Sequence, residues 1–581
     1  MIKNKCTSLI VFLIISLLVS AGLPLQTTTA AETDAKSKSD PNNEASTDAT
    51  SEPQQPRLLV VPLDNRPANT YYPKKVGQAG GIEVILPPQH LIQQQSSAGA
   101  LNELSDWILE NSDQVDGFII SADMTTDGGL VNSRTSAQPM ETALQHLEII
   151  KTLKAQHPTK PLYVYDTIQR LAPTVLEDGN LEKYNLIRDW AITYDEAINL
   201  NNTELLPRLT ELEEKIDSSL IEEYTEIRSR NNLINSTLID WTKQGYIDFL
   251  ILGQDDANKT GLHRKEQESL IQKINTYNIQ HKVHLFDGAD EIDVILVSRF
   301  LSRLHNYQTT FKIHYLGVNG AEWVSPFDHY SLQTNIEKHV IAAGGIIASP
   351  YQQAHVELYV NTPSAQSGFT SLAAFENTKE ITDAVAEIKS QITNGKHVVF
   401  IDVEKVNQAN LAYGDAIIND IGITNLLSYS AFNTAGNAVG TAVGHANARF
   451  LYLEKAAHSP ESDEQAAKGH VEFLLQSIAS DHLYRNNIEP KVQWYVRYIG
   501  SNAWDIGPHK NSVLNFTKEA AFKEFDLLHE KVKNSRVLLS KESGNTSTAQ
   551  IENFALQRID LPWNRLFEIE FDFDVNFSEE K

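Results

Sequence analysis

Short runs of consecutive apolar residues recur along this chain, and stretches with helical spacing separate them. In the first run after residue 50, four apolar residues, Leu58 to Val61, follow one another, and Pro62 ends them. This pattern is typical of a strand buried on both faces, because neither face of such a strand meets water. Further runs occupy residues 82–86, 115–121, 161–165, 247–252, 283–286, 311–316, 356–360 and 397–401. Strands that alternate with helices predict an α/β fold with a mostly parallel sheet.

Two arrangements of these strands are open. If the runs at 82–86 and 283–286 are peripheral, the remaining strands suit an eight-stranded, TIM-like barrel, which we favour. The alternative is a doubly wound open sheet. On the barrel hypothesis the strand ends lie at Asp64, Asp123, Asp166, Asp255, Gly317, Asn361, Asp402 and Asn433.

The N-terminal residues differ in composition from the rest of the chain. Lysines precede an apolar run at 9–19, and small residues follow it, so residues 1–31 are predicted to be a signal peptide. Residues 32–56 are almost all small or polar and are predicted to be a disordered linker. We therefore expect a protein that is secreted, extracellular or attached to the cell wall, without stable membrane insertion once the signal is removed.

The remaining chain is expected to fold into two parts. Residues 57–445 carry the strand runs and are predicted to be an α/β domain, with a helical insertion at about 175–245. Residues 446–581 are predicted to be a C-terminal helical or α+β subdomain, because two helical stretches precede an alternating segment at 566–573.

Charge and cysteine content exclude several classes of function. The formal net charge is −26, whereas a nucleic-acid partner requires clustered Lys and Arg, so no nucleic acid is expected to bind. The single cysteine, Cys6, falls in the predicted signal peptide, which excludes thiol chemistry in the mature protein. The glycine-bearing loops lack the GxGxxG and P-loop patterns, and we expect no cofactor.

Polar residues follow strand after strand, and the carboxyl ends of parallel strands share one edge of a sheet. Asp255 and Asp256 form the most distinctive pair, because adjacent carboxylates can be held at different pKa values by unequal burial. We predict that these two residues are catalytic. The predicted substrate-binding residues are Asp64, Asn65, Arg66, Asp123, Arg134, Asn258, Trp323, Asp402, Asn433 and Asn437.

Several motifs together resemble the bacterial family known as domain of unknown function 4127. They are residues 62–67 (PLDNRP), 128–134 (GGLVNSR), 253–257 (GQDDA), 433–437 (NTAGN) and 561–568 (LPWNRLFE). Phe432 departs from the Trp that we expect in this family's block. The resemblance covers nearly the whole chain after the linker and implies no established activity.

The pair of aspartates also resembles the arrangement in O-GlcNAcase-like hexosaminidases. In a retaining glycosidase for N-acetylated sugars, one carboxylate orients the acetamido group as internal nucleophile and the other protonates the leaving oxygen. A secreted glycan hydrolase of this N-acetylhexosaminidase-like type, with a carbohydrate or cell-wall glycan as substrate, is the function we expect.

Two other functions remain open. The same aspartates, with Asp64, Asp123 and Asp127, could hold a divalent metal ion in a hydrolase, although no cluster of histidines supports this. The chain could also bind a cell-wall glycan without catalysis. The sequence leaves the oligomeric state open.

Overall fold

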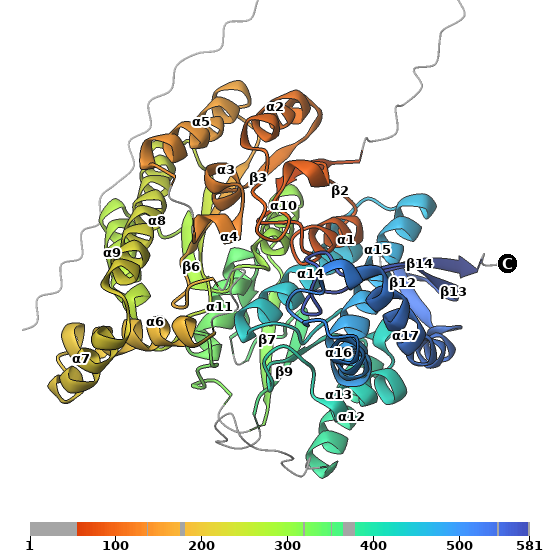
Figure 1. Ribbon diagram of the computed structural model, residues 1–581. Coiled ribbons are helices and arrows are strands. Elements are labelled where there is room, and N and C mark those ends of the chain that lie inside the picture. The colour runs from red at the N-terminus through yellow and green to blue at the C-terminus, as the bar shows by residue number, and fades with distance from the viewer. Residues whose placement is uncertain are drawn as a thin grey trace, which may run out of the picture. The chain divides into compact units, whose positions relative to one another are not determined.

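Two parallel β-sheets and one antiparallel sheet form the framework of the part of the chain described by the structure, a computed structural model (Figure 1). The structure describes residues 55–135, 138–174, 181–317, 320–349, 351–363, 378–542 and 545–578. The predicted signal peptide and residues 32–54 of the predicted linker lie outside these residues.

The first sheet has six parallel strands in the order β2-β1-β3-β4-β5-β6. Its strands are β1 (Arg57–Val61), β2 (Glu83–Ile85), β3 (Gly117–Ser121), β4 (Leu162–Ile168), β5 (Phe249–Gln254) and β6 (Val283–Asp287). The helices of this part are α1 (Tyr71–Ala79), α2 (Leu101–Asn111), α3 (Ala122–Asp127), α4 (Leu130–Ser133), α5 (Met140–Gln156), α8 (Ser218–Gln244), α9 (Leu262–Tyr277) and α10 (Ile292–Leu304).

Alternate residues of each strand face two different layers of helices. Leu58 and Val60 of β1 pack in one core cluster with residues of α1 and α10. Leu59 and Val61 pack in another cluster with residues of α2, α5, α8 and α9. Because helices cover both faces, Leu58 to Val61 of β1 are apolar at consecutive positions, as the sequence predicts.

The second sheet has five parallel strands in the order β11-β10-β9-β7-β8. Its strands are β7 (Thr310–Leu316), β8 (Ile346–Ile347), β9 (Val356–Asn361), β10 (His397–Asp402) and β11 (Ser428–Ser430), and its helices are α11 (Leu332–Ala342), α12 (Thr378–Thr393), α13 (Leu411–Ala416) and α14 (Ala435–Lys455).

Helices α10 and α14 join the two sheets. Both helices contribute to one core cluster that also contains residues of β1 and of β9. Their close approach depends on small residues of α14, since a Cβ added at Gly444 would lie 2.6 Å from Val294 Cγ1. At the start of α14, a Cβ added at Gly436 would meet the backbone oxygen of Asp287, so this helix begins directly against the end of β6.

The α/β class and the mostly parallel sheets are confirmed, but the TIM-like barrel is not. The strand ends counted for the barrel divide between two open sheets, and the two runs left out of that count form β2 and β6, both paired in the first sheet. Each sheet has helices on its faces, which is compatible with the doubly wound alternative. An apolar run reports burial on both faces but not the partner strand, so it cannot separate a closed sheet from two open ones.

The helices between β4 and β5 have a small core of their own. Helices α6 (Leu181–Tyr194) and α7 (Leu206–Lys215) pack with the first part of α8 around Trp190, Leu212 and Tyr224. This helical segment occupies the region predicted to be an insertion at about 175–245.

The C-terminal elements share a core with the second sheet. They are α15 (Pro460–Ile478), α16 (Glu489–Tyr498), α17 (Lys510–Val532) and the antiparallel strands β12 (Arg536–Glu542), β13 (Asn545–Asp560) and β14 (Glu570–Ser578). Phe571 of β14 belongs to the same cluster as Phe400 of β10. No helix within the described residues has both the length and the apolarity needed to cross a bilayer.

Candidate active site

The loops that follow five neighbouring strands of the first sheet carry the candidate residues. The strands β1, β3, β4, β5 and β6 are adjacent and parallel, so their carboxyl ends share one edge. These ends carry Asp64, Asp123, Asp166, Asp255 and Asp290. All five carboxylates are buried or nearly so.

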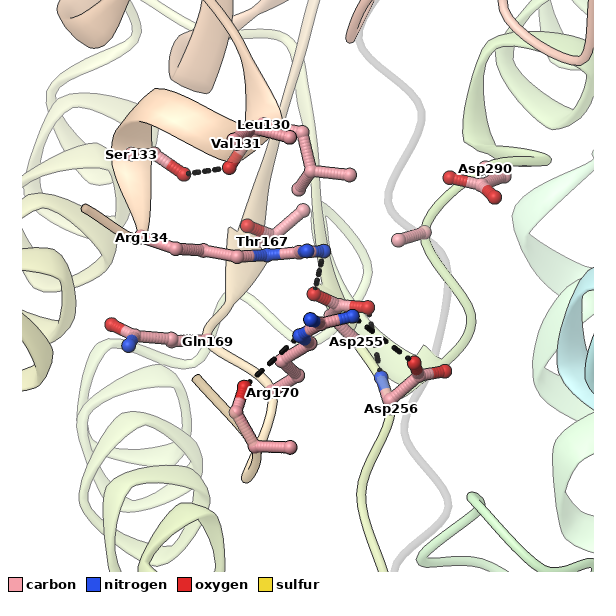
Figure 2. Close-up of polar contacts among 12 residues, drawn as sticks. Leu130, Val131, Ser133, Arg134, Thr167, Gln169, Arg170, Asp255, Asp256 and Asp290 are labelled. Atoms are coloured by element: carbon pink, nitrogen blue, oxygen red, sulfur yellow. Dashed lines mark hydrogen bonds and ion pairs between the residues drawn. The ribbon is translucent and has the colours of Figure 1, made fainter. Parts of the chain in front are cut away.

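Asp255 and Asp256, the two predicted catalytic residues, face different surroundings (Figure 2). Asp255 is buried and forms a salt bridge with Arg134, whose side chain is also buried. The side chain of Asp256 is 33% exposed, and its nearest cation is Arg170, with Nη1 at 3.6 Å from Oδ2. The backbone N–H of Asp256 donates to Oδ1 of Asp255 at 2.9 Å, which orients the Asp255 carboxylate relative to the backbone of Asp256.

Backbone hydrogen bonds hold this pair against the loop after β4. The N–H of Asp255 donates to the oxygen of Ile168 at 3.1 Å, and the N–H of Leu171 donates to the oxygen of Asp256 at 3.0 Å.

Desolvation and the charge of Asp255 raise the pKa of Asp256, against the opposing effect of Arg170. Asp256 is therefore the member of the pair that is suited to carry a proton.

Arg66 connects the end of β1 to the end of β6. Its Nε donates to both oxygens of Asp64, at 2.9 and 3.0 Å, and its terminal nitrogens donate to Asp290 at 2.6 and 3.0 Å. Burial raises the pKa of Asp290 to about 6, although Arg66 opposes this change. Asp290 was not among the predicted site residues, because it follows a strand run that the barrel count treated as peripheral.

The predicted residues Asn433 and Asn437 hold this same segment. Asn433 donates from Nδ2 to Asp290 at 2.8 Å. The side-chain oxygen of Asn437 accepts from the backbone N–H groups of Ala289 at 3.1 Å and Asp290 at 3.2 Å. The start of α14 thus fixes the loop after β6. This agrees with the close approach of Gly436 in α14 to the backbone of Asp287 at the end of β6.

The C-terminal motif at 561–568 also reaches this edge. Trp563 donates from Nε1 to Oδ1 of Asn65 at 2.6 Å, although the two residues are 498 positions apart. The guanidinium carbons of Arg66 and Arg565 each lie 4.8 Å from the centre of the Trp563 ring. The indole is therefore in contact with two arginines, and it ties the C-terminal segment to the loop after β1.

A cavity of about 40 Å³ lies beside Arg66 and Asp290. Its other walls include Tyr72, Phe432 and Phe567. The ring centres of Phe432 and Phe567 are 5.5 Å apart, and the guanidinium of Arg485 lies 4.5 Å from the centre of the Phe432 ring. The ring of Phe432 therefore contacts another aromatic ring and a cation, although Trp was expected at this position.

Asp123 and Asp402 are engaged in internal networks. Asp123 accepts from the backbone N–H of Thr167 at 3.0 Å, and burial raises its pKa to about 6. Its neighbour Asp166 has a pKa raised well above the ordinary value by burial and by the charge of Asp123. Asp402 lies at the end of β10 in the second sheet and accepts from Asn361 Nδ2 at 2.9 Å.

Within the described residues, no hydrogen bond or ion pair joins Asn258 or Trp323 to Asp255 or Asp256. Asn258 is half-buried in the loop after β5 and interacts through its backbone with His263. The half-buried ring of Trp323 packs against the main core cluster. Within the described residues, no three His, Cys, Asp or Glu side chains are grouped to hold a metal ion.

The five motifs that carry the family resemblance therefore meet at this edge. Arg134 pairs with Asp255, Trp563 donates to Asn65, and the N–H of Leu130 donates to the backbone oxygen of Leu63 at 3.4 Å. Arg66 and Asn433 both donate to Asp290, which joins the fourth motif to the first. A search of curated proteins gives no match. A family model described as protein of unknown function (DUF4127) matches residues 58–572, which confirms the resemblance over nearly the whole chain. The chain belongs to this DUF4127 family.

Proposed function

We propose that this protein is a glycan hydrolase, a retaining glycosidase of the N-acetylhexosaminidase-like type, with Asp256 as proton donor. The observation that carries this proposal is the unequal environment of two adjacent carboxylates. Asp255 is buried against Arg134, whereas Asp256 is partly exposed and has a raised pKa. A glycosidase needs one carboxyl group that is charged and one that can give a proton to the leaving oxygen.

The proposed reaction proceeds in two displacements. The carbonyl oxygen of the substrate's acetamido group bonds to the anomeric carbon while the bond from that carbon to the leaving oxygen breaks. Asp256 gives its proton to the leaving oxygen, and the charge of Asp255 balances the positive charge on the cyclised acetamido group. Water then attacks the anomeric carbon, returns a proton to Asp256 and reopens the acetamido group, so the configuration is retained.

Around this pair, Arg66, Arg134 and Asn433 are the side chains that we expect to bind hydroxyl groups of the sugar. They come from three of the family motifs, and hydrogen bonds hold each of them in place. Such pre-positioned polar groups favour a ligand with many hydroxyls.

Hydrolysis of a panel of aryl glycosides, with N-acetylated and plain sugars, tests the proposal. Asp256→Asn should lower kcat by about 10²–10⁴-fold, because the general acid is lost. The loss should be smaller with a dinitrophenyl than with a nitrophenyl leaving group, since the better leaving group needs less protonation. Asp255→Asn should also lower kcat, but by a similar factor for both leaving groups.

The same assay separates the other two functions. Turnover that EDTA abolishes would favour a metal-dependent hydrolase. Binding of glycans without turnover of any substrate in the panel would favour a non-catalytic cell-wall or glycan-binding protein. Turnover that is equally fast in the Asp256→Asn variant would contradict the proposed acid.

We also propose that the protein acts outside the cytoplasm. The order of charged, apolar and small residues within residues 1–31 supports this location. N-terminal sequencing of the exported protein should show a mature chain that begins near residue 31 or 32. A full-length chain retained in the cytoplasm would contradict export.

A further inference from the structure

The cavity beside Asp290 and the two candidate catalytic aspartates lie at the same edge of the first sheet. Arg66 and Asp290 both line it. The N–H of Gly288 donates to the backbone oxygen of Gln254 at 2.9 Å, so the segment that carries Asp290 lies beside the segment that carries Asp255 and Asp256. Figure 2 shows Asp290 across from Asp255 and Asp256, on a separate segment of the chain. A substituent of a sugar held at Asp256 is therefore within reach of this cavity.

Most of the surface inside the cavity comes from apolar groups. Tyr72, Phe432, Phe567 and Ile569 form its walls, together with Pro67. Tyr72 and Ile569 are almost fully buried. Burial of a methyl group against such walls is favourable by the hydrophobic effect.

The polar side chains of the cavity already have partners. Arg485 donates to Glu489 at 2.9 Å and to the backbone oxygen of Phe567, and Glu568 accepts from Arg565 Nε at 2.6 Å. A hydroxyl group placed against the apolar walls, away from Asp290, would lose its hydrogen bonds to water without gaining equivalent ones. The walls therefore favour an apolar group over a hydroxyl group.

The size of the cavity limits what can enter it. A site needs at least about 10–15 Å³ of this kind of space for one water molecule. The cavity of about 40 Å³ thus holds roughly three water-sized groups. That volume fits the few atoms of an acetyl group and is too small for a sugar ring.

Asp290 supplies a hydrogen-bond acceptor for such a substituent. Its Oδ2 accepts from Arg66 and Asn433, whereas its Oδ1 accepts from Arg66 at 2.6 Å. A carboxylate oxygen accepts two hydrogen bonds, so Oδ1 retains a lone pair for an N–H donor. An amide fits this combination, because it carries an N–H group beside a methyl group.

We propose that this cavity binds the acetamido group of the substrate sugar, with its methyl group against the rings of Phe432 and Phe567 and its N–H donated to Asp290. This subsite rests on the proposed glycosidase function for the nature of the ligand, but not for its geometry. The subsite gives Asp290 and Phe432 a role in substrate specificity. No sequence motif and no residue spacing indicates this role.

Binding of methyl glycosides to the inactive Asp256→Asn protein, measured by calorimetry and saturation-transfer NMR, tests this subsite. Methyl glycosides of N-acetylglucosamine and N-acetylgalactosamine should bind at least about tenfold more tightly than those of glucose and galactose. N-butanoyl analogues should lose this advantage, because the longer chain exceeds the cavity. The strongest NMR saturation should fall on the acetyl methyl group.

Two variants complete the test. Phe432→Trp fills the cavity and should remove the preference for N-acetylated sugars, provided that circular dichroism shows a folded protein. Asp290→Ala should weaken binding of N-acetylated sugars more than binding of the plain sugars. Equal affinity for the acetylated and plain sugars in the Asp256→Asn protein, failure of both to bind included, would overturn the subsite.

The test of this subsite and the test of the proposed function can give different results. A clear preference for N-acetylated ligands with no hydrolysis by the wild-type protein would support the subsite and reject the glycosidase. Faster hydrolysis of N-acetylated than of plain aryl glycosides, without a binding preference in the Asp256→Asn protein, would support the glycosidase and reject the subsite.

Discussion

The carboxyl ends of β5 and β10 look alike in the sequence but differ in the structure. Each strand ends at two acidic residues, the adjacent Asp255 and Asp256 in one case, and Asp402 and Glu404 with one residue between them in the other. At the end of β5 the partners are the arginines 134 and 170. At the end of β10 the partners are amides, since Asn361 donates to Asp402 and Glu404 at 2.9 and 3.2 Å.

This difference separates a candidate site from a structural network. Asn410 completes the β10 network, because its N–H donates to Asp402 at 2.7 Å while its side-chain oxygen caps α13. Both oxygens of Asp402 are thus used to fix the chain. Asp256, by contrast, is partly exposed, and its closest cation is 3.6 Å away, so it remains available to a ligand. The partners of a strand-end carboxylate, more than its position, indicate its role.

The largest expected effect concerns turnover. Asp256→Asn should lower kcat by about 10²–10⁴-fold, because it removes the proton donor. Asp402→Asn, the matched change at the end of β10, should leave kcat of the folded protein unchanged. Steady-state kinetics on the same aryl glycoside compares the two, and an equal loss of kcat in both variants would erase the distinction.

The second expected effect concerns stability. Arg134→Met leaves Asp255 buried without its cation, which costs about 3–5 kcal/mol of the free energy of unfolding. The matched change Asn361→Leu removes an amide donor and should cost only about 1–3 kcal/mol. Urea denaturation measures both values.

A double variant sharpens this second comparison. Arg134→Met combined with Asp255→Asn has no buried charge at this position, and it should recover most of the lost stability. If the double variant is as unstable as Arg134→Met alone, the salt bridge does not explain the loss.

The third effect is a pH dependence at the β10 end. Burial raises the pKa of Asp402 from its ordinary value of 3.8 to about 6. Between these values the native state keeps a proton that the unfolded chain releases, so the contribution of Asp402 to stability falls as the pH rises, by at most about 1.4 kcal/mol per pH unit. Asp402→Asn lacks this titration.

Urea denaturation of the wild-type and Asp402→Asn proteins at several pH values measures this contribution. The stability of the wild type relative to the variant should decrease as the pH rises through that window and stay constant above it. A difference that does not vary with pH would contradict the raised pKa.

Much of the fold could be predicted from the sequence because each strand carries its own evidence. The runs at 58–61 and 247–252 became β1 and β5, since burial on both faces leaves a mark within a few residues. The choice between a barrel and two open sheets could not be made in this way. That choice depends on which strands pair, and β5 pairs with β6, whose run was treated as peripheral.

The candidate site was predictable where the residues form motifs and not where pairing is distant. Arg66 and Asn433 were predicted from strand-end motifs, and both contact Asp290. Asp290 itself carries no motif, and its partner Arg66 is 224 positions away, so nothing local indicates the pair. Asp402 also lies at the end of a buried strand, as Asp255 does, and only their different partners, an amide and an arginine, distinguish the two.

The smallest expected effect tests whether the C-terminal segment belongs to the site at the end of β5. Trp563→Phe keeps an aromatic ring between Arg66 and Arg565 but removes the hydrogen bond to Asn65, and it should cost about 0.5–1.5 kcal/mol of stability. Trp504→Phe is the matched control, since Trp504 is 63% exposed and its change should cost less than about 0.5 kcal/mol. Urea denaturation compares the two. Equal costs would mean that Trp563 is only a packing residue. If Trp563→Phe costs more stability than Trp504→Phe and also lowers kcat/KM, which Trp504→Phe does not, the C-terminal motif positions Arg66 in the site at the end of β5. It then has no part in the network at the end of β10.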